Sequence, residues 1–223
     1  FLTEKNSFIF ESVEKGKIKG RYTIFGKNPD KIWEFNNNNS YLTKNKKKIK
    51  LKDRPDQLIE KIIEDFKFET PKKLPKICSL ISGYFSYDSI RYIEKIPNKC
   101  KNDLNLPDVR LLRPRTLVIY DNLKKEIFYI INIFSDEKIK DYAKKYEEIK
   151  IELSKVLIQS SLKISNYLTK KTIKDIKVKS NTPKNKFIKM VHKAKDYIKR
   201  GDIFQVVLSQ RFEAKLTKKP LDI

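Results

Sequence analysis

The sequence predicts an α+β fold in which largely antiparallel sheets carry packed helices. Short stretches of β-preferring apolar residues are bounded by Gly, Asn and other turn residues, and one pair of them flanks a polar loop, as in a β-hairpin. Longer stretches have apolar residues at helical spacing. With 39% hydrophobic residues, 13 Phe and 11 Tyr among 223 residues, the chain has enough apolar material for a sizeable core.

The predicted strands lie mostly in the first 134 residues. Four consecutive Asn at 36–39 predict a turn. Residues 121–125 form the polar loop of the predicted hairpin and contain Asp-Asn, which tolerates turn geometry. The predicted strands are residues 7–13, 20–26, 32–35 and 79–86, and the hairpin pair 115–120 and 126–134.

Two helices are predicted within the same part of the chain. Residues 55–66 form a short amphipathic helix, because Leu58, Ile62 and Phe66 recur every four residues behind an initial Pro. A long helix is predicted from Ser135, a suitable N-cap followed by acidic residues. Its apolar stripe would comprise Ile139, Tyr142, Tyr146, Ile149, Leu153 and Val156. Residues 87–94 are expected to begin a further helix.

The last part of the chain predicts a helix followed by a strand. Thr182 is the expected N-cap, Pro183 the first helical residue, and Gly201 the end of the helix. One face of this helix would carry Phe187, Val191, Ala194 and Ile198, with His192 beside it at the surface. Residues 203–215 then predict a strand with Phe204, Val206, Leu208 and Phe212 towards a core and Gln205 on the opposite, more polar face. Periodicity alone favours an ordinary solvated face for Gln205.

Composition excludes several classes of protein. The net charge of +23 comes from 43 Lys and only 8 Arg, spread along the chain, which fits a compositional bias better than a nucleic-acid site. No apolar run reaches the length of about 20 residues that a membrane span needs. Cys78 and Cys100 fit no metal spacing and are expected to be reduced thiols in a cytoplasmic protein. With His192 as the single His, no zinc site or Ser-His-Asp triad is predicted.

Four blocks of the sequence resemble a known enzyme family. FIFESVEKGKIKGRYTIFG at 8–26, GYFSYDSIRYIEKIP at 83–97 and RTLVIYDNLKKE at 115–126 are similar to the N-terminal domain of the anthranilate synthase large subunit, a chorismate-utilising enzyme. GDIFQVVLSQRF at 201–212, after the helix end YIKRGD, is similar to the opening of that family's chorismate-binding domain. The blocks occur in the family's order and cover essentially the whole chain.

The resemblance implies a function and a domain plan. Members of this family convert chorismate and ammonia to anthranilate and pyruvate with Mg²⁺, and the ammonia comes from glutamine through an amidotransferase subunit. Residues 1–165 would be the regulatory, tryptophan-binding domain, 166–180 a linker, and 181–223 the incomplete beginning of the catalytic domain. The family's magnesium ligands lie further along, so the chain is expected to be a truncated portion, inactive alone, with no metal-ligating residue of its own.

The resemblance also gives Gln205 a candidate catalytic role. Relatives that add water to chorismate carry Lys at this position, because water needs a base. Ammonia already has a free lone pair, so a neutral amide is enough to orient it. Gln205 therefore favours an ammonia-using enzyme, and Val207 favours anthranilate synthase over the related aminodeoxychorismate synthase, which usually has Asn there. A non-catalytic tryptophan-sensing or subunit-docking module is the alternative of a different class.

A second set of candidate residues concerns feedback inhibition. Ile9-Phe10-Glu11-Ser12 resembles the family's Leu-Leu-Glu-Ser segment, which helps to bind the inhibitor L-tryptophan. Glu11 and Ser12 would accept hydrogen bonds from the ammonium group, and Phe10, in place of the usual Leu, would supply an apolar wall. Arg21 is a weaker candidate for the same site. If residues 7–13 form only an edge strand, none of these assignments is needed.

Overall fold

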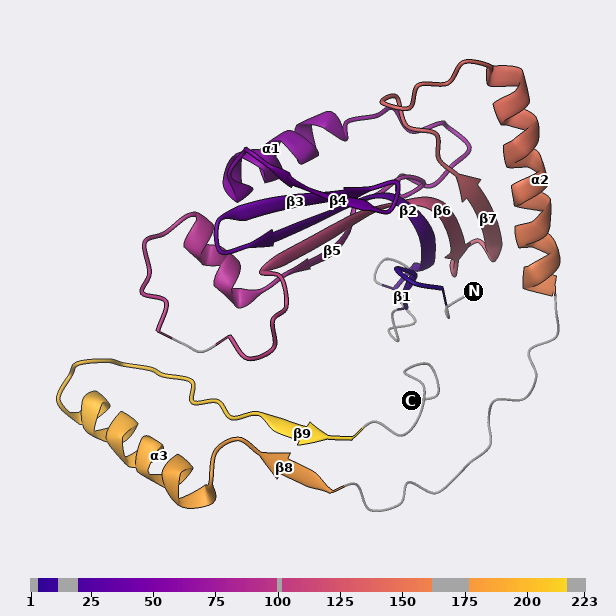
Figure 1. The fold of residues 1–223 in the computed structure, drawn as a ribbon. Helices are drawn as coiled ribbons and strands as arrows, with labels where there is room; N and C mark the ends of the chain where they lie inside the picture. Colours follow the sequence, from indigo (N-terminus) through magenta and orange to yellow (C-terminus); the bar gives the residue numbers. More distant parts are fainter. Residues whose placement is uncertain (1–3, 12–19, 100–101, 162–176, 216–223) are drawn as a thin grey trace. The chain divides into compact units, whose positions relative to one another are not determined.

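The computed structural model describes residues 4–11, 20–99, 102–161 and 177–215, and it confirms a mixed α+β fold with mostly antiparallel sheet (Figure 1). The chain divides into two compact units, Phe1–Leu162 and Lys163–Ile223, which are described separately below.

The first unit is built on a seven-stranded antiparallel sheet. Five strands follow the order β4-β3-β2-β6-β5, while β1 pairs with β2 and β7 pairs with β6. The elements are β1 (Phe8–Phe10), β2 (Tyr22–Asn36), β3 (Asn39–Lys44), β4 (Lys47–Leu51), α1 (Pro55–Asp65), β5 (Ser82–Phe85), the 3₁₀ helix η1 (Tyr87–Tyr92), β6 (Val109–Asp121), β7 (Glu126–Ile131) and α2 (Tyr142–Ser161).

Two long central strands, β2 and β6, hold the sheet together. The first half of β2 pairs with β1, its second half pairs with β3, and β6 lies along the other side of both halves. The register shifts between Pro29 and Lys31, so Asp30 is an extra residue, as in a β-bulge. Pro29 lies opposite Pro114 at this point, where neither strand can donate a backbone hydrogen bond. The bulge therefore divides the sheet into two halves.

The Asn-rich turn is confirmed, and it has the geometry of a tight hairpin. Asn37 and Asn38 both have positive φ, 47° and 61°, as a type I′ turn between β2 and β3 requires. Asn45 and Lys46, with φ of 51° and 64°, make the same kind of turn between β3 and β4. The sequence analysis predicted neither β3 nor β4. For β4, the Lys-rich stretch at 44–52 hides the alternation that would mark a strand.

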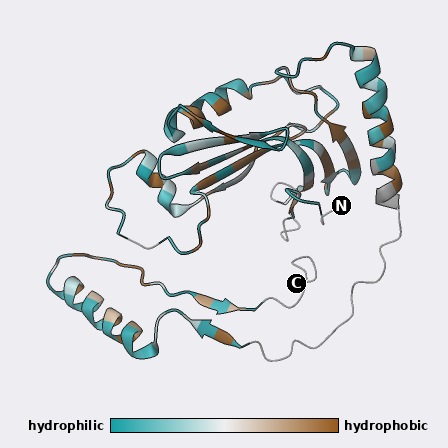
Figure 2. Cartoon of the chain, viewed as in Figure 1, coloured by the Kyte–Doolittle hydropathy of each residue, from teal (hydrophilic) through white to brown (hydrophobic). Residues whose placement is uncertain are grey.

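Other predicted elements changed in extent. Residues 32–35 are the second half of β2 rather than a separate strand, residues 79–86 contain a shorter strand, β5, and residues 87–94 contain η1. The predicted helix at 55–66 is confirmed as α1, and the predicted hairpin is confirmed as β6 and β7. Figure 2 shows how hydrophobic β7 is compared with the mixed surfaces of α1 and α2.

One face of the sheet carries two hydrophobic clusters. Alternate residues of β6 point to this face, first Val109 and Leu111 in one cluster and later Leu117 and Ile119 in the other. The first cluster packs under α1 and contains Trp33, Phe35, Leu58, Ile62, Tyr92, Val109 and Leu111. The second cluster contains Cys78, Leu117, Ile119 and Ile130. The same alternation places Arg113 and Arg115 between the two clusters.

Two glycines allow close approach of chain segments within the sheet. A Cβ at Gly26 would lie 2.3 Å from the end of the Phe8 ring, because Phe8 is the partner of Gly26 across β1 and β2. A Cβ at Gly83 would lie 1.9 Å from the backbone oxygen of Arg110. The ring at Gly26 can move aside, whereas the backbone at Gly83 cannot, so Gly83 is the stricter requirement.

The prediction that a helix begins at Ser135 is wrong, because α2 begins at Tyr142. The Oδ1 atom of Asp141 accepts a hydrogen bond from the backbone N–H of Lys144 at 3.0 Å, which is the geometry of an N-cap. The two acidic residues after Ser135 are used elsewhere: Asp136 pairs with Lys31 and Arg113, and Glu137 pairs with Arg115. Tertiary ion pairs therefore outweigh the local helix-start signal.

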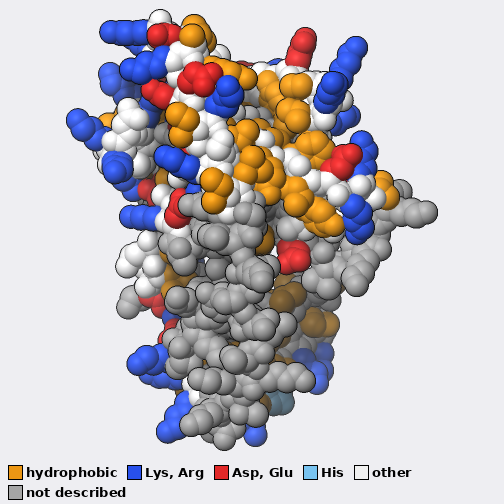
Figure 3. All heavy atoms as spheres, turned by 90° about the vertical axis from the view of Figure 1, so that its right-hand side faces the viewer, with side chains coloured by type: hydrophobic (Ala, Val, Ile, Leu, Met, Phe, Trp, Pro, Cys, Tyr) orange, Lys and Arg blue, Asp and Glu red, His pale blue; other side chains and the backbone are white. Residues whose placement is uncertain are grey.

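The long helix α2 keeps much of its apolar surface exposed. Ile149 and Leu153 of the predicted stripe are half-buried, whereas Tyr142 and Tyr146 are exposed. Val156, the last member of the stripe, has a side chain outside the described ones. Figure 3 shows hydrophobic side chains gathered on the upper part of the face that contains α2. The exposed apolar residues of this helix are Tyr142, Tyr146, Ile151, Leu157 and Ile158.

The second unit contains β8 (Val178–Ser180), α3 (Lys184–Lys199) and β9 (Phe212–Ala214), with β8 and β9 antiparallel. Gly201 ends α3 as predicted, with φ of 78°. The N–H of Gly201 donates to the Ile198 carbonyl and the N–H of Asp202 donates to the Tyr197 carbonyl, as in a Schellman motif. Thr182 is not the N-cap: the cap position is Pro183, without a side-chain hydrogen bond.

The predicted strand at 203–215 is present only as β9. Residues 203–211 are not in a strand, and Phe204, expected to face a core, is 94% exposed. A strand needs a neighbouring strand for its backbone hydrogen bonds, and among the described residues this segment has β8 as its partner only at Phe212–Ala214. Of the residues expected to face a core, Phe204, Val206 and Phe212 are exposed and Leu208 is half-buried.

Candidate functional site

The predicted inhibitor segment lies at the end of the edge strand β1. Phe10 is the partner of Ile24 in β2, its side chain is 48% exposed, and its ring centroid lies 4.9 Å from that of Phe8. Glu11 follows the strand and is exposed. Ser12 lies outside the described residues. The described part of the segment thus has an exposed aromatic residue followed in the chain by an exposed carboxylate.

Arg21 is engaged within the protein. Its Nε atom donates to both carboxylate oxygens of Asp121 at 3.1 Å, and its Nη2 atom donates to Oδ2 at 2.7 Å. Asp121 is almost fully buried and also accepts from the backbone N–H groups of Leu123 and Lys124. The hydrogen bonds from Arg21, the largest cause, lower the pKa of Asp121 to about 2. They also raise the pKa of Arg21. The Nε and Nη2 edge of the Arg21 guanidinium is therefore held by Asp121.

Gln205 belongs to the second unit and lies in the segment between α3 and β9. Its side chain is exposed, as are those of Phe204 and Val207. The hydrogen bonds of the Schellman motif at Gly201 fix the direction in which the chain leaves α3. Ser180, at the end of β8, bonds the Gln210 side chain at 3.2 Å and so ties the far end of the segment to β8. Gln205 therefore lies on a segment anchored at both ends.

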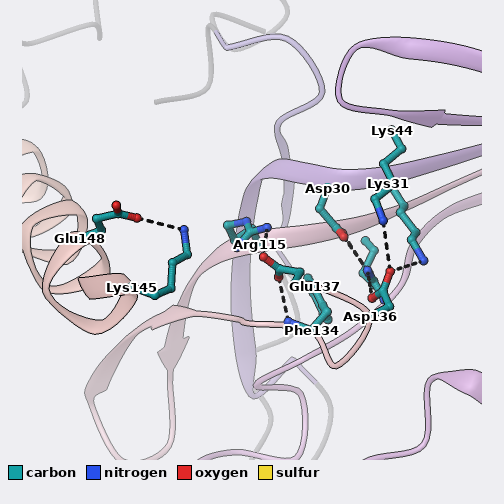
Figure 4. A network of polar contacts seen from close by, with 10 residues as sticks. Asp30, Lys31, Lys44, Arg115, Phe134, Asp136, Glu137, Lys145 and Glu148 are labelled. Carbon is teal, nitrogen blue, oxygen red and sulfur yellow. Dashed lines mark hydrogen bonds and ion pairs between the residues drawn. The ribbon is translucent and has the colours of Figure 1, made fainter. Parts of the chain in front are cut away.

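A network of ion pairs separates the two hydrophobic clusters of the first unit (Figure 4). Arg113 donates to Asp30 at 2.9 and 2.5 Å and to Asp136 at 2.8 Å, while its guanidinium lies 3.7 Å from the centre of the Phe134 ring. Lys31 adds a second cation to Asp136 at 2.7 Å. The network joins the β-bulge, strand β6 and the loop that leads to α2.

The same network borders an open groove of about 830 Å³. Its lining includes Arg115, Asp136 and Glu137 of the network together with residues at the start of α2. Burial by itself would raise the pKa of Asp136, but hydrogen bonds from Lys31 and Arg113 outweigh burial and hold the pKa well below its usual range. Asp136 and Glu137 are already paired with Lys31, Arg113 and Arg115. We therefore interpret the ion pairs at this groove as stabilising the fold rather than as catalytic groups.

The described residues offer no metal site. Among them, no group of three or more His, Cys, Asp or Glu side chains is placed to hold a metal ion, so no magnesium ligand is assigned within 4–11, 20–99, 102–161 or 177–215. In the same ranges, no helix is both long and apolar enough to cross a membrane.

Sequence reasoning missed Asp121 and the Arg113 network. Arg21 and Asp121 are 100 residues apart, and Arg113 and Asp30 are 83 apart, so no local spacing could pair them. One feature of the sequence did indicate that these arginines need partners. The alternation of β6 puts Arg113 and Arg115 on the same face as Leu111 and Leu117, and buried arginines require carboxylate partners.

Comparisons with known proteins point to one family over the length of both units. Residues 5–223 match the family model described as chorismate binding enzyme. Anthranilate synthase component 1 of Acetivibrio thermocellus is 34% identical over 97% of this chain and 44% of its own length, and that of Aquifex aeolicus (strain VF5) is 29% identical over 100% and 45%. The crystal structure of anthranilate synthase component I from Streptococcus pneumoniae TIGR4 matches with a TM-score of 0.75 and 26% identity, over 99% of this chain and 47% of that one.

The chain therefore spans less than half the length of these relatives and corresponds to an N-terminal portion of them. The family model covers both the antiparallel sheet of the first unit and the helix and strands of the second. On this evidence the chain belongs to the chorismate-binding enzyme family, as a homologue of anthranilate synthase component 1.

Proposed function

We propose that this chain is the N-terminal part of an enzyme that converts chorismate and ammonia to anthranilate and pyruvate in tryptophan biosynthesis. The observation that carries the proposal is the match to an anthranilate synthase component 1 over 97% of the chain at 34% identity. The proposed plan keeps residues 1–165 as a regulatory domain, 166–180 as a linker, and 181–223 as the beginning of the catalytic domain.

Gln205 is the proposed contribution of this chain to the reaction. A side-chain amide has a carbonyl that accepts a hydrogen bond from ammonia and an NH₂ group that donates to a neighbouring oxygen. It can therefore orient ammonia while leaving the nitrogen lone pair free to attack. Its exposure in this chain supports the role, because an orienting group must be open to the nucleophile. A Lys here would instead place a positive charge beside a neutral nucleophile.

Phe10, Glu11 and Ser12 are the proposed inhibitor-binding residues of the first unit. Free L-tryptophan has an ammonium group, a carboxylate and a flat apolar indole ring. The half-exposed ring of Phe10 supplies an apolar face, and the exposed carboxylate of Glu11 supplies an acceptor for the ammonium group. The Nε and Nη2 edge of the Arg21 guanidinium is directed at Asp121 rather than at this site.

Magnesium and a glutamine amidotransferase subunit complete the proposed enzyme. The metal would be held by residues in the part of the relatives that this chain does not span. The amidotransferase subunit would supply ammonia from glutamine. We further propose that the enzyme acts in the cytoplasm.

The proposal is tested with a full-length enzyme, made by joining this chain to the remaining length of the Acetivibrio thermocellus relative. Chorismate, Mg²⁺ and ammonium should yield fluorescent anthranilate and pyruvate, and L-tryptophan should inhibit. The 223-residue chain alone should yield none. Aminodeoxychorismate as the product would overturn the assignment in favour of the folate-pathway relative.

Replacing Ser12 by Phe tests the inhibitor site in the same enzyme. A bulky side chain should weaken inhibition by L-tryptophan while the rate without inhibitor stays nearly the same. An unchanged inhibition curve would remove Ser12 from the site.

A further inference from the structure

The start of β2 is fastened to the β6–β7 turn by polar contacts from two consecutive residues of the turn. Asp121 holds the Arg21 guanidinium through three hydrogen bonds of 2.7 to 3.1 Å. The backbone N–H of Asn122 donates to the Arg21 carbonyl at 2.7 Å, and its Nδ2 atom lies 3.4 Å from the Gly20 carbonyl. We call Gly20, Arg21, Asp121 and Asn122 the β2 clamp.

Asp121 is bonded on both carboxylate oxygens, and it holds the Nε and Nη2 edge of the Arg21 guanidinium. Asp121 is 1% exposed, and its Oδ1 atom also accepts the N–H groups of Leu123 and Lys124 at 3.0 and 3.2 Å. The carboxylate therefore organises the turn and binds Arg21 at the same time. Gly20 has φ of 72°, so the chain enters the sheet through a left-handed residue at this point. Together these features fix where β2 begins.

Strand β1 depends on that fixed position. It is only three residues long, and within the described chain its sole strand partner is β2. Phe10 lies opposite Ile24, three residues after Arg21, and Glu11 comes next. A short edge strand has few backbone hydrogen bonds of its own, so fraying of β2 at Tyr22 would carry Phe10 and Glu11 with it.

We infer that Arg21 and Asp121 are positioning residues for the inhibitor site: they hold Phe10 and Glu11 in place through β2 and do not touch the ligand. This inference rests on the proposed function of Phe10 and Glu11. It reassigns Arg21 from a direct contact to an indirect one, and it adds Asp121, which lies 100 residues away in the chain.

The test uses the full-length enzyme described above with Arg21→Gln, Asp121→Asn and the double variant. Each should raise the L-tryptophan concentration for half-inhibition at least about tenfold, with kcat and KM for chorismate within about twofold of the parent. The double variant should resemble the single ones, because both single changes open the same clamp. Arg21→Lys keeps the positive charge but loses the two-nitrogen edge that binds Asp121. Its inhibition by L-tryptophan should therefore be intermediate between the parent and Arg21→Gln. Arg54→Gln, which breaks the exposed pair with Asp56, is the matched control and should change nothing.

A second measurement needs no inhibitor. In the 223-residue chain, Arg21→Gln should speed hydrogen exchange at Phe8–Phe10 at least about tenfold and leave exchange at Trp33, in the far half of β2, unchanged. Unchanged exchange at β1, or loss of inhibition that tracks an equal loss of kcat, would overturn the inference. A parent enzyme that L-tryptophan does not inhibit would instead overturn the proposed inhibitor site, whatever the exchange data show.

Discussion

The two units of the chain differ in what covers their hydrophobic residues. In the first unit, Phe35, Val109, Leu117 and Ile119 are fully buried between the sheet and its covering segments. In the described part of the second unit, residues 177–215, no side chain is buried, and Phe204 and Val207 are 94% and 83% exposed. The first unit therefore has its own core, whereas residues 177–215 of the second present apolar surface with no buried side chain.

The difference predicts where substitutions in the two units should act. A sheet with two hydrophobic clusters and a buried ion network needs no further partner to exclude water from its core. A helix with no buried residue and a half-formed strand do need one. We accordingly expect substitutions in the first unit to change stability, and substitutions in the second unit to change activity with little change in stability.

The largest expected effect is on the stability of the first unit. Phe35→Ala should lower the free energy of unfolding of this chain by about 3–5 kcal/mol, because it leaves a cavity under α1 where the side chain is now 0% exposed. Phe204→Ala, the matched change in the second unit, should cost less than about 0.5 kcal/mol. Denaturant unfolding measures both. Equal losses would mean that the second unit has a core after all.

An intermediate effect is expected at Gln205, and it should appear in activity rather than stability. In the full-length enzyme, Gln205→Lys should reduce ammonia-dependent anthranilate formation about 100-fold, equivalent to about 2.7 kcal/mol, with at most a trace of hydroxylated product. The melting temperature should stay unchanged, because the side chain is exposed in this chain. Gln57→Lys on the exposed side of α1 is the matched control. If the Gln205→Lys enzyme formed anthranilate at the parent rate, the proposed role of Gln205 would be wrong.

The smallest expected effect is on the acid response of the first unit. Asp121 has a pKa of about 2 in the folded chain, below the value of about 4 expected when unfolded. A depressed pKa means that the ion pair stabilises the fold above about pH 4, and that this contribution is lost as the pH falls towards 2. Between pH 5 and pH 2, the free energy of unfolding of Asp121→Asn should therefore decrease less than that of the parent chain, as measured by urea titration.

Arg21→Gln should flatten the acid response to a similar degree, because hydrogen bonding to Arg21 is the largest cause of the lowered pKa. A slope equal to that of the parent in both variants would show that Asp136, Glu137 and Glu34, whose pKa values are also lowered, dominate the response.

The sequence by itself determined the features that depend on neighbouring residues. The Asn pair at the tip of the β2–β3 hairpin, the four-residue repeat of α1 and the Gly201 helix end all appear where predicted, because φ preferences and side-chain periodicity act over a few residues. The order of the similar sequence blocks also indicated the family, which the comparisons then showed.

Tertiary structure decided the features that depend on distant partners. The helix predicted at Ser135 begins instead at Tyr142, because Asp136 and Glu137 are drawn into ion pairs with strands β2 and β6. Arg21 is bound by a carboxylate 100 residues away. The alternating segment at 203–211 is not in a strand, and within the described part of the chain no strand pairs with it. Local patterns show what a segment can form, whereas its final structure depends on which partners the fold brings beside it.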